Sequence, residues 1–91
     1  MKWVELIRVR SSADAVKEAI PSLKKKMDEI SQSTSAEETF MANHALYDGD
    51  LSVVVVWNND VEPMKSREGL LLAEHLCQLG PVDHAVWIPV K

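Results

Sequence analysis

Four consecutive valines, Val53 to Val56, followed directly by Trp57, constrain the fold of this chain more than any other feature. β-Branched and aromatic residues favour strands, and successive side chains of a strand point to opposite faces of its sheet. This segment is therefore apolar on both faces. An antiparallel sheet with one face in water alternates apolar and polar residues instead. We predict a strand from Leu51 to Trp57 that is covered on both sides.

A second strand is predicted just before it, because Asp48-Gly49 lies between two apolar runs. Asp-Gly is a strong signal for a two-residue hairpin turn. We predict that Thr39 to Tyr47 pairs with Leu51 to Trp57 around this turn. The turn sets Leu46 opposite Leu51, His44 opposite Val53, Ala42 opposite Val55 and Phe40 opposite Trp57, all on one face. Met41, Asn43, Ala45, Val54 and Val56 share the other face.

The two ends of the chain predict further strands, from Trp3 to Val9 and from His84 to Val90. Both are rich in β-branched and large apolar residues. The first strand places Val4 and Leu6 on one face and Trp3, Ile7 and Val9 on the other. The last strand places Val86, Ile88 and Val90 on one face and Ala85 and Trp87 on the other. Both strands therefore carry apolar residues on both faces.

The first predicted helix follows the N-terminal strand. Its apolar residues recur at steps of four and three and form one stripe: Val16, Ile20, Leu23, Met27 and Ile30. Ser11, Ser12 and Asp14 supply side-chain oxygens that can cap its first turn. Pro21 interrupts the stripe, and we predict a kink or break near Ala19.

The second predicted helix runs from Arg67 to Leu79, with Ser66 as its N-cap. Leu72, Ala73, Leu76 and Leu79 form its buried stripe. Gly80-Pro81 ends the helix, because glycine accepts the left-handed conformation after a helix and proline cannot continue one.

The order of elements predicts an α+β, ferredoxin-like βαββαβ sandwich in a single domain, residues 1–91. Right-handed crossovers lead to a four-stranded antiparallel sheet with both helices on one face. The opposite face would then expose a large apolar surface, which is unusual for a monomer. We predict that a second copy covers it, as a homodimer through the sheet face. The alternative is a monomer shielded by long side chains such as Arg8 and Arg10.

Composition excludes several classes of protein. The net charge is −4 and the only basic run is Lys24 to Lys26, so no nucleic-acid partner is expected. No apolar run is long enough to cross a bilayer. Cys77 is the only cysteine, which excludes an internal disulfide and a site built on several thiolates. We predict a cytoplasmic protein without a metal, a membrane partner or a tightly bound cofactor.

The segment Ser66 to Trp87, SREGLLLAEHLCQLGPVDHAVW, resembles the dimeric α/β-barrel superfamily, and in particular small antibiotic-biosynthesis-monooxygenase-like proteins. The resemblance is carried by Gly69, Leu72-Ala73, Leu76, Gly80, Val82, His84 and Trp87, with Trp57 before them. It implies a dimer with a ligand cavity between sheet and helices. Members of the superfamily include cofactor-independent oxygenases, haem-degrading enzymes, isomerases and proteins without known activity.

The resemblance also implies a test for haem degradation. The haem-degrading branch has an Asn early in the first strand, then a Trp and a His on the second helix. Here the first strand has no Asn, and the second helix has His75 but no Trp. Haem binding through His75 remains a third hypothesis, after the two stated below.

Candidate site residues are those able to move protons or to line a cavity. His44 and Asn43 are the catalytic candidates, because a strand histidine facing a cavity can act as a base. Glu5, Trp57, His75 and Trp87 are the candidates for binding. His84 is interpreted as a polar residue at the end of a strand.

The leading functional hypothesis is a small-molecule-binding homodimer, monooxygenase-like and without a cofactor. The second hypothesis is a non-enzymatic dimer with a ligand-sensing or structural role. The interior discriminates between them. A closed pocket of about 300 Å³ or more with His44 or Asn43 pointing into it favours ligand chemistry, and a filled core favours the second.

Overall fold

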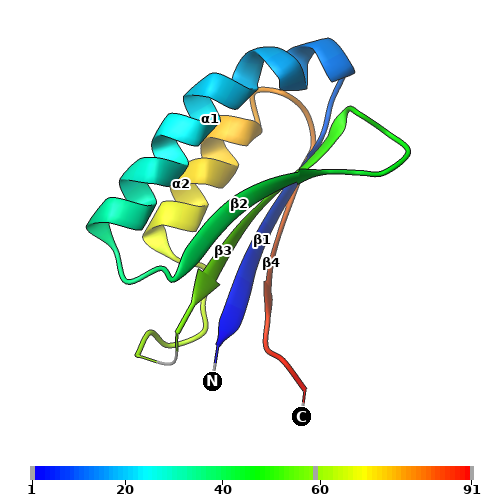
Figure 1. Ribbon diagram of the computed structural model, residues 1–91. Helices are drawn as coiled ribbons and strands as arrows, with labels where there is room; N and C mark the ends of the chain where they lie inside the picture. The colour runs from blue at the N-terminus through cyan, green and yellow to red at the C-terminus, as the bar shows by residue number, and fades with distance from the viewer. Residues whose placement is uncertain (1, 59, 91) are drawn as a thin grey trace.

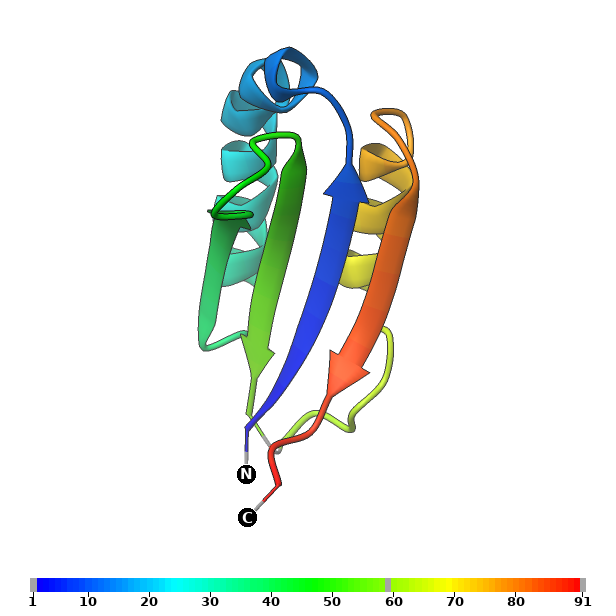
Figure 2. The same cartoon turned by 90° about the vertical axis from the view of Figure 1, so that its right-hand side faces the viewer.

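The computed structural model describes residues 2–58 and 60–90. Its sheet is antiparallel throughout, in the strand order β2-β3-β1-β4, and both helices lie on one side of it (Figures 1 and 2). The elements are β1 (Trp3–Arg10), α1 (Ala13–Ser33), β2 (Glu38–Asn43), β3 (Asp50–Trp57), α2 (Arg67–Leu76) and β4 (Val82–Trp87). The predicted ferredoxin-like βαββαβ fold is confirmed.

The core lies between the sheet and the helices. Every second residue of β1 and β3 points inward, as the period of a strand requires, and these side chains are at most 3% exposed: Trp3, Glu5, Ile7, Val9, Leu51, Val53, Val55 and Trp57. The apolar stripe of α1 closes this layer over β2 and β3, and Leu72 and Leu76 of α2 close it over β1 and β4 (Figure 2).

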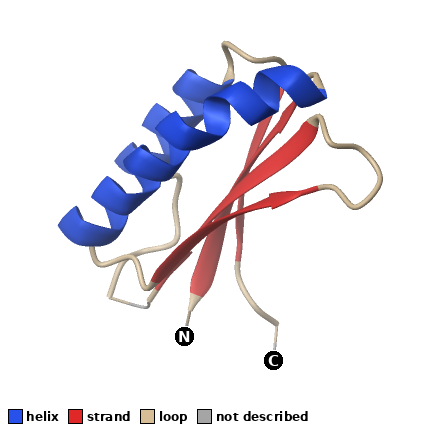
Figure 3. Ribbon diagram, turned by 45° about the horizontal axis from the view of Figure 1, so that its top comes forward, coloured by secondary structure: helices blue, strands red, loops and turns tan. Residues whose placement is uncertain are grey.

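The prediction was a kink or a break near Ala19, and because the first helix is continuous through Pro21, no break occurs. Ser12 caps the helix, and its Oγ accepts the amide of Ala15 at 3.1 Å. The apolar stripe is buried on both sides of the proline, at Val16 and at Leu23. Packing of both halves onto the sheet therefore outweighs the one backbone hydrogen bond that proline removes. The helix axis changes direction after the first turns, as Figure 3 shows.

The predicted two-residue hairpin turn is wrong. β2 ends at Asn43, and residues 44–49 form a longer loop before β3. The pairs are Asn43↔Leu51, Ala42↔Ser52, Met41↔Val53 and Phe40↔Val54, so the predicted register is also wrong. A type I′ Asp-Gly turn needs positive φ values, and no described residue has one. Gly49 instead packs against the backbone of Ser11, and its carbonyl accepts the Ser11 amide at 2.8 Å.

The boundaries of the last two elements also differ from prediction. α2 ends at Leu76 rather than Leu79, and Gly80 does not adopt a left-handed conformation. Gly80 is needed for close approach, because a Cβ there would collide with the carbonyl of Arg10. β4 consists of Val82 to Trp87, and these residues pair with Val9 to Val4 of β1. Ile88 and Val90 lie beyond the ladder and are exposed.

The outer face of the sheet, opposite the helices, is apolar over most of its length. The register places Val4, Leu6, Phe40, Ala42, Val54, Val56, Ala85 and Trp87 there. Phe40 is 43% exposed and Trp87 is 58% exposed. Arg8 and Arg10 reach the acidic groups of Asp83 and Asp50, at 3.8 Å and 3.1 Å. They therefore shield one end of the outer face and leave Phe40 and Trp87 in water.

Candidate functional site

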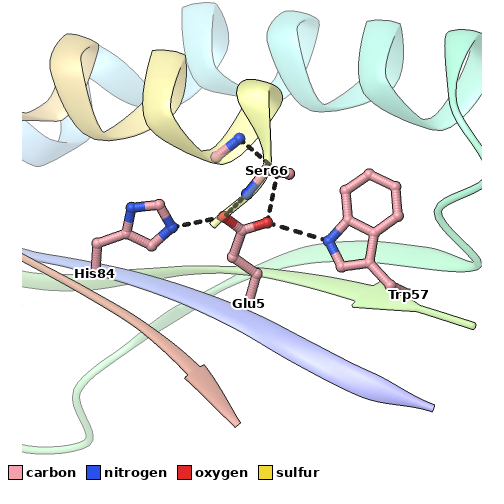
Figure 4. Close-up of polar contacts among 5 residues, drawn as sticks. Glu5, Trp57, Ser66 and His84 are labelled. Atoms are coloured by element: carbon pink, nitrogen blue, oxygen red, sulfur yellow. Dashed lines mark hydrogen bonds and ion pairs between the residues drawn. The ribbon is translucent and has the colours of Figure 1, made fainter. Parts of the chain in front are cut away.

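A carboxylate lies inside the core. Glu5 occupies an inward-facing position of β1, between Trp3 and Ile7, and is 0% exposed. Burying a charge costs several kcal/mol unless it is hydrogen-bonded. The position of Glu5 under the start of α2 supplies the partners that make this burial possible (Figure 4).

Four hydrogen bonds hold the Glu5 carboxylate. Oε1 accepts from Trp57 Nε1 at 3.1 Å and from Ser66 Oγ at 2.6 Å. Oε2 accepts the Ser66 amide at 3.0 Å and lies 2.6 Å from His84 Nε2. β1, β3, β4 and the start of α2 therefore meet at one side chain. Trp57 is itself stacked on Trp3, with ring centroids 5.9 Å apart.

The start of α2 is built around this carboxylate. Ser66 is the N-cap, and its Oγ accepts the Gly69 amide at 2.9 Å while donating to Glu5. The first turn of a helix carries a partial positive charge, which favours a nearby carboxylate. Gly69 is buried against Glu5, and a Cβ at this position would overlap the carboxyl group. Glycine is thus required here for space rather than for backbone conformation.

Ser66 serves two hydrogen bonds at once, which makes Ser66→Ala a sensitive substitution. We expect a loss of about 2 kcal/mol in the free energy of unfolding, because an N-cap contributes about 1 kcal/mol and a hydrogen bond to a charged group about as much again. Urea unfolding measures this. Ser12→Ala at the cap of α1 is the matched control, since Ser12 caps its helix without a buried carboxylate, and should cost about 1 kcal/mol. Equal losses in the two variants would contradict the dual role of Ser66.

His84 and Glu5 form a carboxylate–imidazole pair. The side chain of His84 is 7% exposed and that of Glu5 is 0% exposed. With Glu5 ionised, its oxygens only accept hydrogen bonds, and a neutral His84 ring would then carry its proton on Nε2, facing Oε2. The other ring nitrogen, Nδ1, then carries a lone pair. No buried side-chain nitrogen or oxygen lacks a partner among the described residues.

Two of the six predicted site residues come together in this cluster, Glu5 and Trp57. The catalytic candidates do not. His44 lies outside β2 in an exposed loop, where its Nδ1 accepts the Leu46 amide at 3.0 Å. Asn43 donates to the Asp48 carbonyl at 3.1 Å and closes the same loop. The observed register takes His44 out of β2, and Asn43, opposite the inward-facing Leu51, is exposed at the end of its strand.

The other two candidates are also separate from the cluster. His75 lies near the end of α2 and is half-buried, while Trp87 lies on the outer face of the sheet. The residues that sequence analysis did not select are His84 and Ser66. A signal for them exists: Glu5 interrupts the inward apolar residues of its strand, so a buried carboxylate needs donors from neighbouring elements.

Two surface depressions lie away from this cluster. One, about 640 Å³, opens beside the hairpin loop and is lined by Arg10, Ser11, Ala13, Leu46, Tyr47, Asp48, Gly49 and Asp50. Another, about 300 Å³, lies between α1 and α2. Both are open to solvent, and neither His44 nor Asn43 lines them. Neither depression is therefore the closed pocket at His44 or Asn43 that would favour ligand chemistry.

Within residues 2–58 and 60–90, no group of three or more His, Cys, Asp or Glu side chains is placed to hold a metal ion. Neither α1 nor α2 has the length and apolar character needed to cross a membrane.

Comparison with known proteins places the fold. No family model and no curated protein matches the sequence. Rv0793 from Mycobacterium tuberculosis is similar in structure, with a TM-score of 0.71 and 15% identity over 100% of this chain and 97% of that one. SnoaB, a cofactor-independent oxygenase from Streptomyces nogalater, has a TM-score of 0.69 and 11% identity over 99% of this chain and 94% of its own. The chain therefore shares the fold of Rv0793 and SnoaB.

Proposed function

We propose that this protein is a homodimer joined through the outer faces of its two sheets, and that it binds a small organic molecule as a monooxygenase-like protein without a cofactor. The apolar outer face, with Phe40 and Trp87 exposed on it, is the observation that carries the dimer. At roughly 25 cal/mol per Å² of apolar surface, covering such a face contributes several kcal/mol before the cost of association.

A self-complementary dimer suits this surface. Both Phe40 on β2 and Trp87 on β4 lie on the outer face but on opposite edge strands. A twofold axis through the sheet face buries both edges of each subunit at once. The charged pairs of Arg8 and Arg10 lie toward one end of the face and can remain at the rim, where ion pairs keep their contact with water.

Light scattering tests the dimer. We expect a mass about twice the 10.2 kDa of one chain at micromolar concentration. Phe40→Glu should raise the dimer dissociation constant at least about tenfold, because a charge would replace an aromatic ring in both subunits of the interface. Leu70→Glu is the matched control: Leu70 is 53% exposed on α2, away from the outer face. A monomeric wild-type mass, or equal effects of the two substitutions, would refute the proposal.

Support for the small-molecule ligand comes from the fold neighbours, since SnoaB is described as a cofactor-independent oxygenase. Such a reaction needs a group that accepts a proton from the organic substrate, because no cofactor supplies the reactivity. The sequence prediction assigned this role to His44, which the fold leaves in an exposed loop. His84, paired with the buried Glu5, is a second candidate for this role.

A second candidate function is a non-enzymatic dimer. The tightly buried interior favours it: core side chains such as Ile7, Leu23 and Leu76 are 0% exposed, and the depressions beside the hairpin loop and between the helices are open rather than enclosed. In this case Glu5 and its three partner residues serve only to hold α2 on the sheet. The kinetic experiment described below separates the two functions.

A further inference from the structure

We propose that His84, oriented by the buried Glu5 carboxylate, is a proton acceptor for a small, weakly acidic organic molecule that approaches the edge of the sheet between β4 and α2. This inference rests on the proposed small-molecule function and names its base and its substrate class. It does not depend on the dimer.

The hydrogen-bond network directs His84. Glu5 Oε2 lies 2.6 Å from Nε2 and holds the ring by that nitrogen. Trp57 and Ser66 donate the other three bonds and fix the carboxylate from the opposite side. The imidazole is thus held in one orientation and one tautomer. A buried carboxylate in this position also stabilises the imidazolium that forms when the ring accepts a proton.

The second ring nitrogen of His84, Nδ1, is the one that can accept a proton from a substrate. Among the described residues His84 Nδ1 has no hydrogen-bond partner, and no fully buried side-chain nitrogen there is unpartnered. Nδ1 is therefore not fully buried, although the side chain as a whole is only 7% exposed. Figure 4 shows this nitrogen on the side of the ring away from Glu5. A lone pair on Nδ1, in a ring whose Nε2 is held by a carboxylate, is the arrangement expected of a general base.

The surroundings select the kind of substrate. His84 is paired with Ile7 in the ladder, and the apolar Leu72 and Leu76 of α2 lie over this part of the sheet. β4 is an edge strand, so the approach is lateral. The Glu5 carboxylate is already hydrogen-bonded to four donor groups. The site therefore suits a neutral, mostly apolar molecule with one acidic proton, such as a carbon acid.

A nitro-substituted benzisoxazole is a suitable probe, because loss of its ring C–H proton is coupled to ring opening. His84 Nδ1 takes the proton, the C–H electron pair forms the nitrile, and the N–O bond breaks to release a coloured cyano-nitrophenolate. The imidazolium then returns the proton to water. The step needs no oxidant and no further reactant.

The variants are His84→Gln, whose amide can still donate to Glu5, with His44→Gln and His75→Gln as controls at the other two histidines. We expect the wild-type rate to saturate with probe, and His84→Gln to lower kcat at least about tenfold, the lower range for loss of a general base. Both controls should stay within about twofold. Equal kcat in wild type and His84→Gln overturns the proposal.

Two further measurements keep the outcomes separate. A nitrogen–proton correlation spectrum of the wild-type protein should show neutral His84 protonated at Nε2 and not at Nδ1. A proton on Nδ1 overturns the proposal even where His84→Gln fails to fold. If the rate saturates with probe but kcat is unchanged in His84→Gln, His84 is not the base, and small-molecule binding still stands. If the rate of the wild-type protein never saturates with probe, both proposals are contradicted. Light scattering of the same samples reports the dimer independently.

Discussion

Glu5→Ala is expected to lower the free energy of unfolding by about 4 kcal/mol, within the range for removing one member of a buried, hydrogen-bonded charge pair. The substitution takes away the common acceptor of Trp57, Ser66 and His84. The Trp57 indole N–H and the Ser66 amide would then be buried without partners, which costs about 1–3 kcal/mol for each group. Water entering the vacated space recovers only part of this loss.

Urea unfolding at a fixed protein concentration measures the effect, since a dimer ties stability to concentration. Glu74→Ala, on the exposed face of α2, is the control and should change stability by less than about 0.5 kcal/mol. Glu5→Gln should fall between the two. It keeps the shape of the side chain, but its amide NH₂ would face groups that also donate. A loss below about 1 kcal/mol for Glu5→Ala would contradict the anchoring role of the carboxylate.

Gly69→Ala is expected to cost about 3 kcal/mol, although alanine is about 1 kcal/mol better than glycine inside a helix. The added Cβ would overlap the Glu5 carboxyl group. A flexible side chain could move aside, but this one is 0% exposed and held by four hydrogen bonds. Either the helix start lifts from the sheet or the carboxylate loses partners, and each alternative belongs to the costly class of overpacking.

A double-mutant cycle isolates the cause. In the Glu5→Ala background the space beside residue 69 is free, so Gly69→Ala should cost at least about 2 kcal/mol less there than in the wild type. Leu70→Ala, at the next and exposed position of α2, is the control for general effects on the helix and should be nearly neutral. If Gly69→Ala costs the same in both backgrounds, the contact with Glu5 is not the reason for glycine at this position.

The local patterns of the chain were sufficient for the order and type of the elements. The steps of four and three from Val16 to Ile30 predicted α1, and the buried residues of that helix follow the same stripe. The valine run predicted a strand apolar on both faces, and β3 has Val53 and Val55 inside and Val54 and Val56 outside. These patterns predict secondary structure because only one backbone conformation places apolar residues of a given spacing on the same face.

The hairpin and the site needed the tertiary structure. Asp48-Gly49 is a local signal, but the backbone contact of Gly49 with Ser11 decides the loop, and a change of loop length moves every side chain of β2. This removed His44 from the inner face. The partners of Glu5 lie 52, 61 and 79 residues away along the chain. Sequence periodicity reports which face a residue occupies, and only the packing of four elements decides which buried polar groups meet.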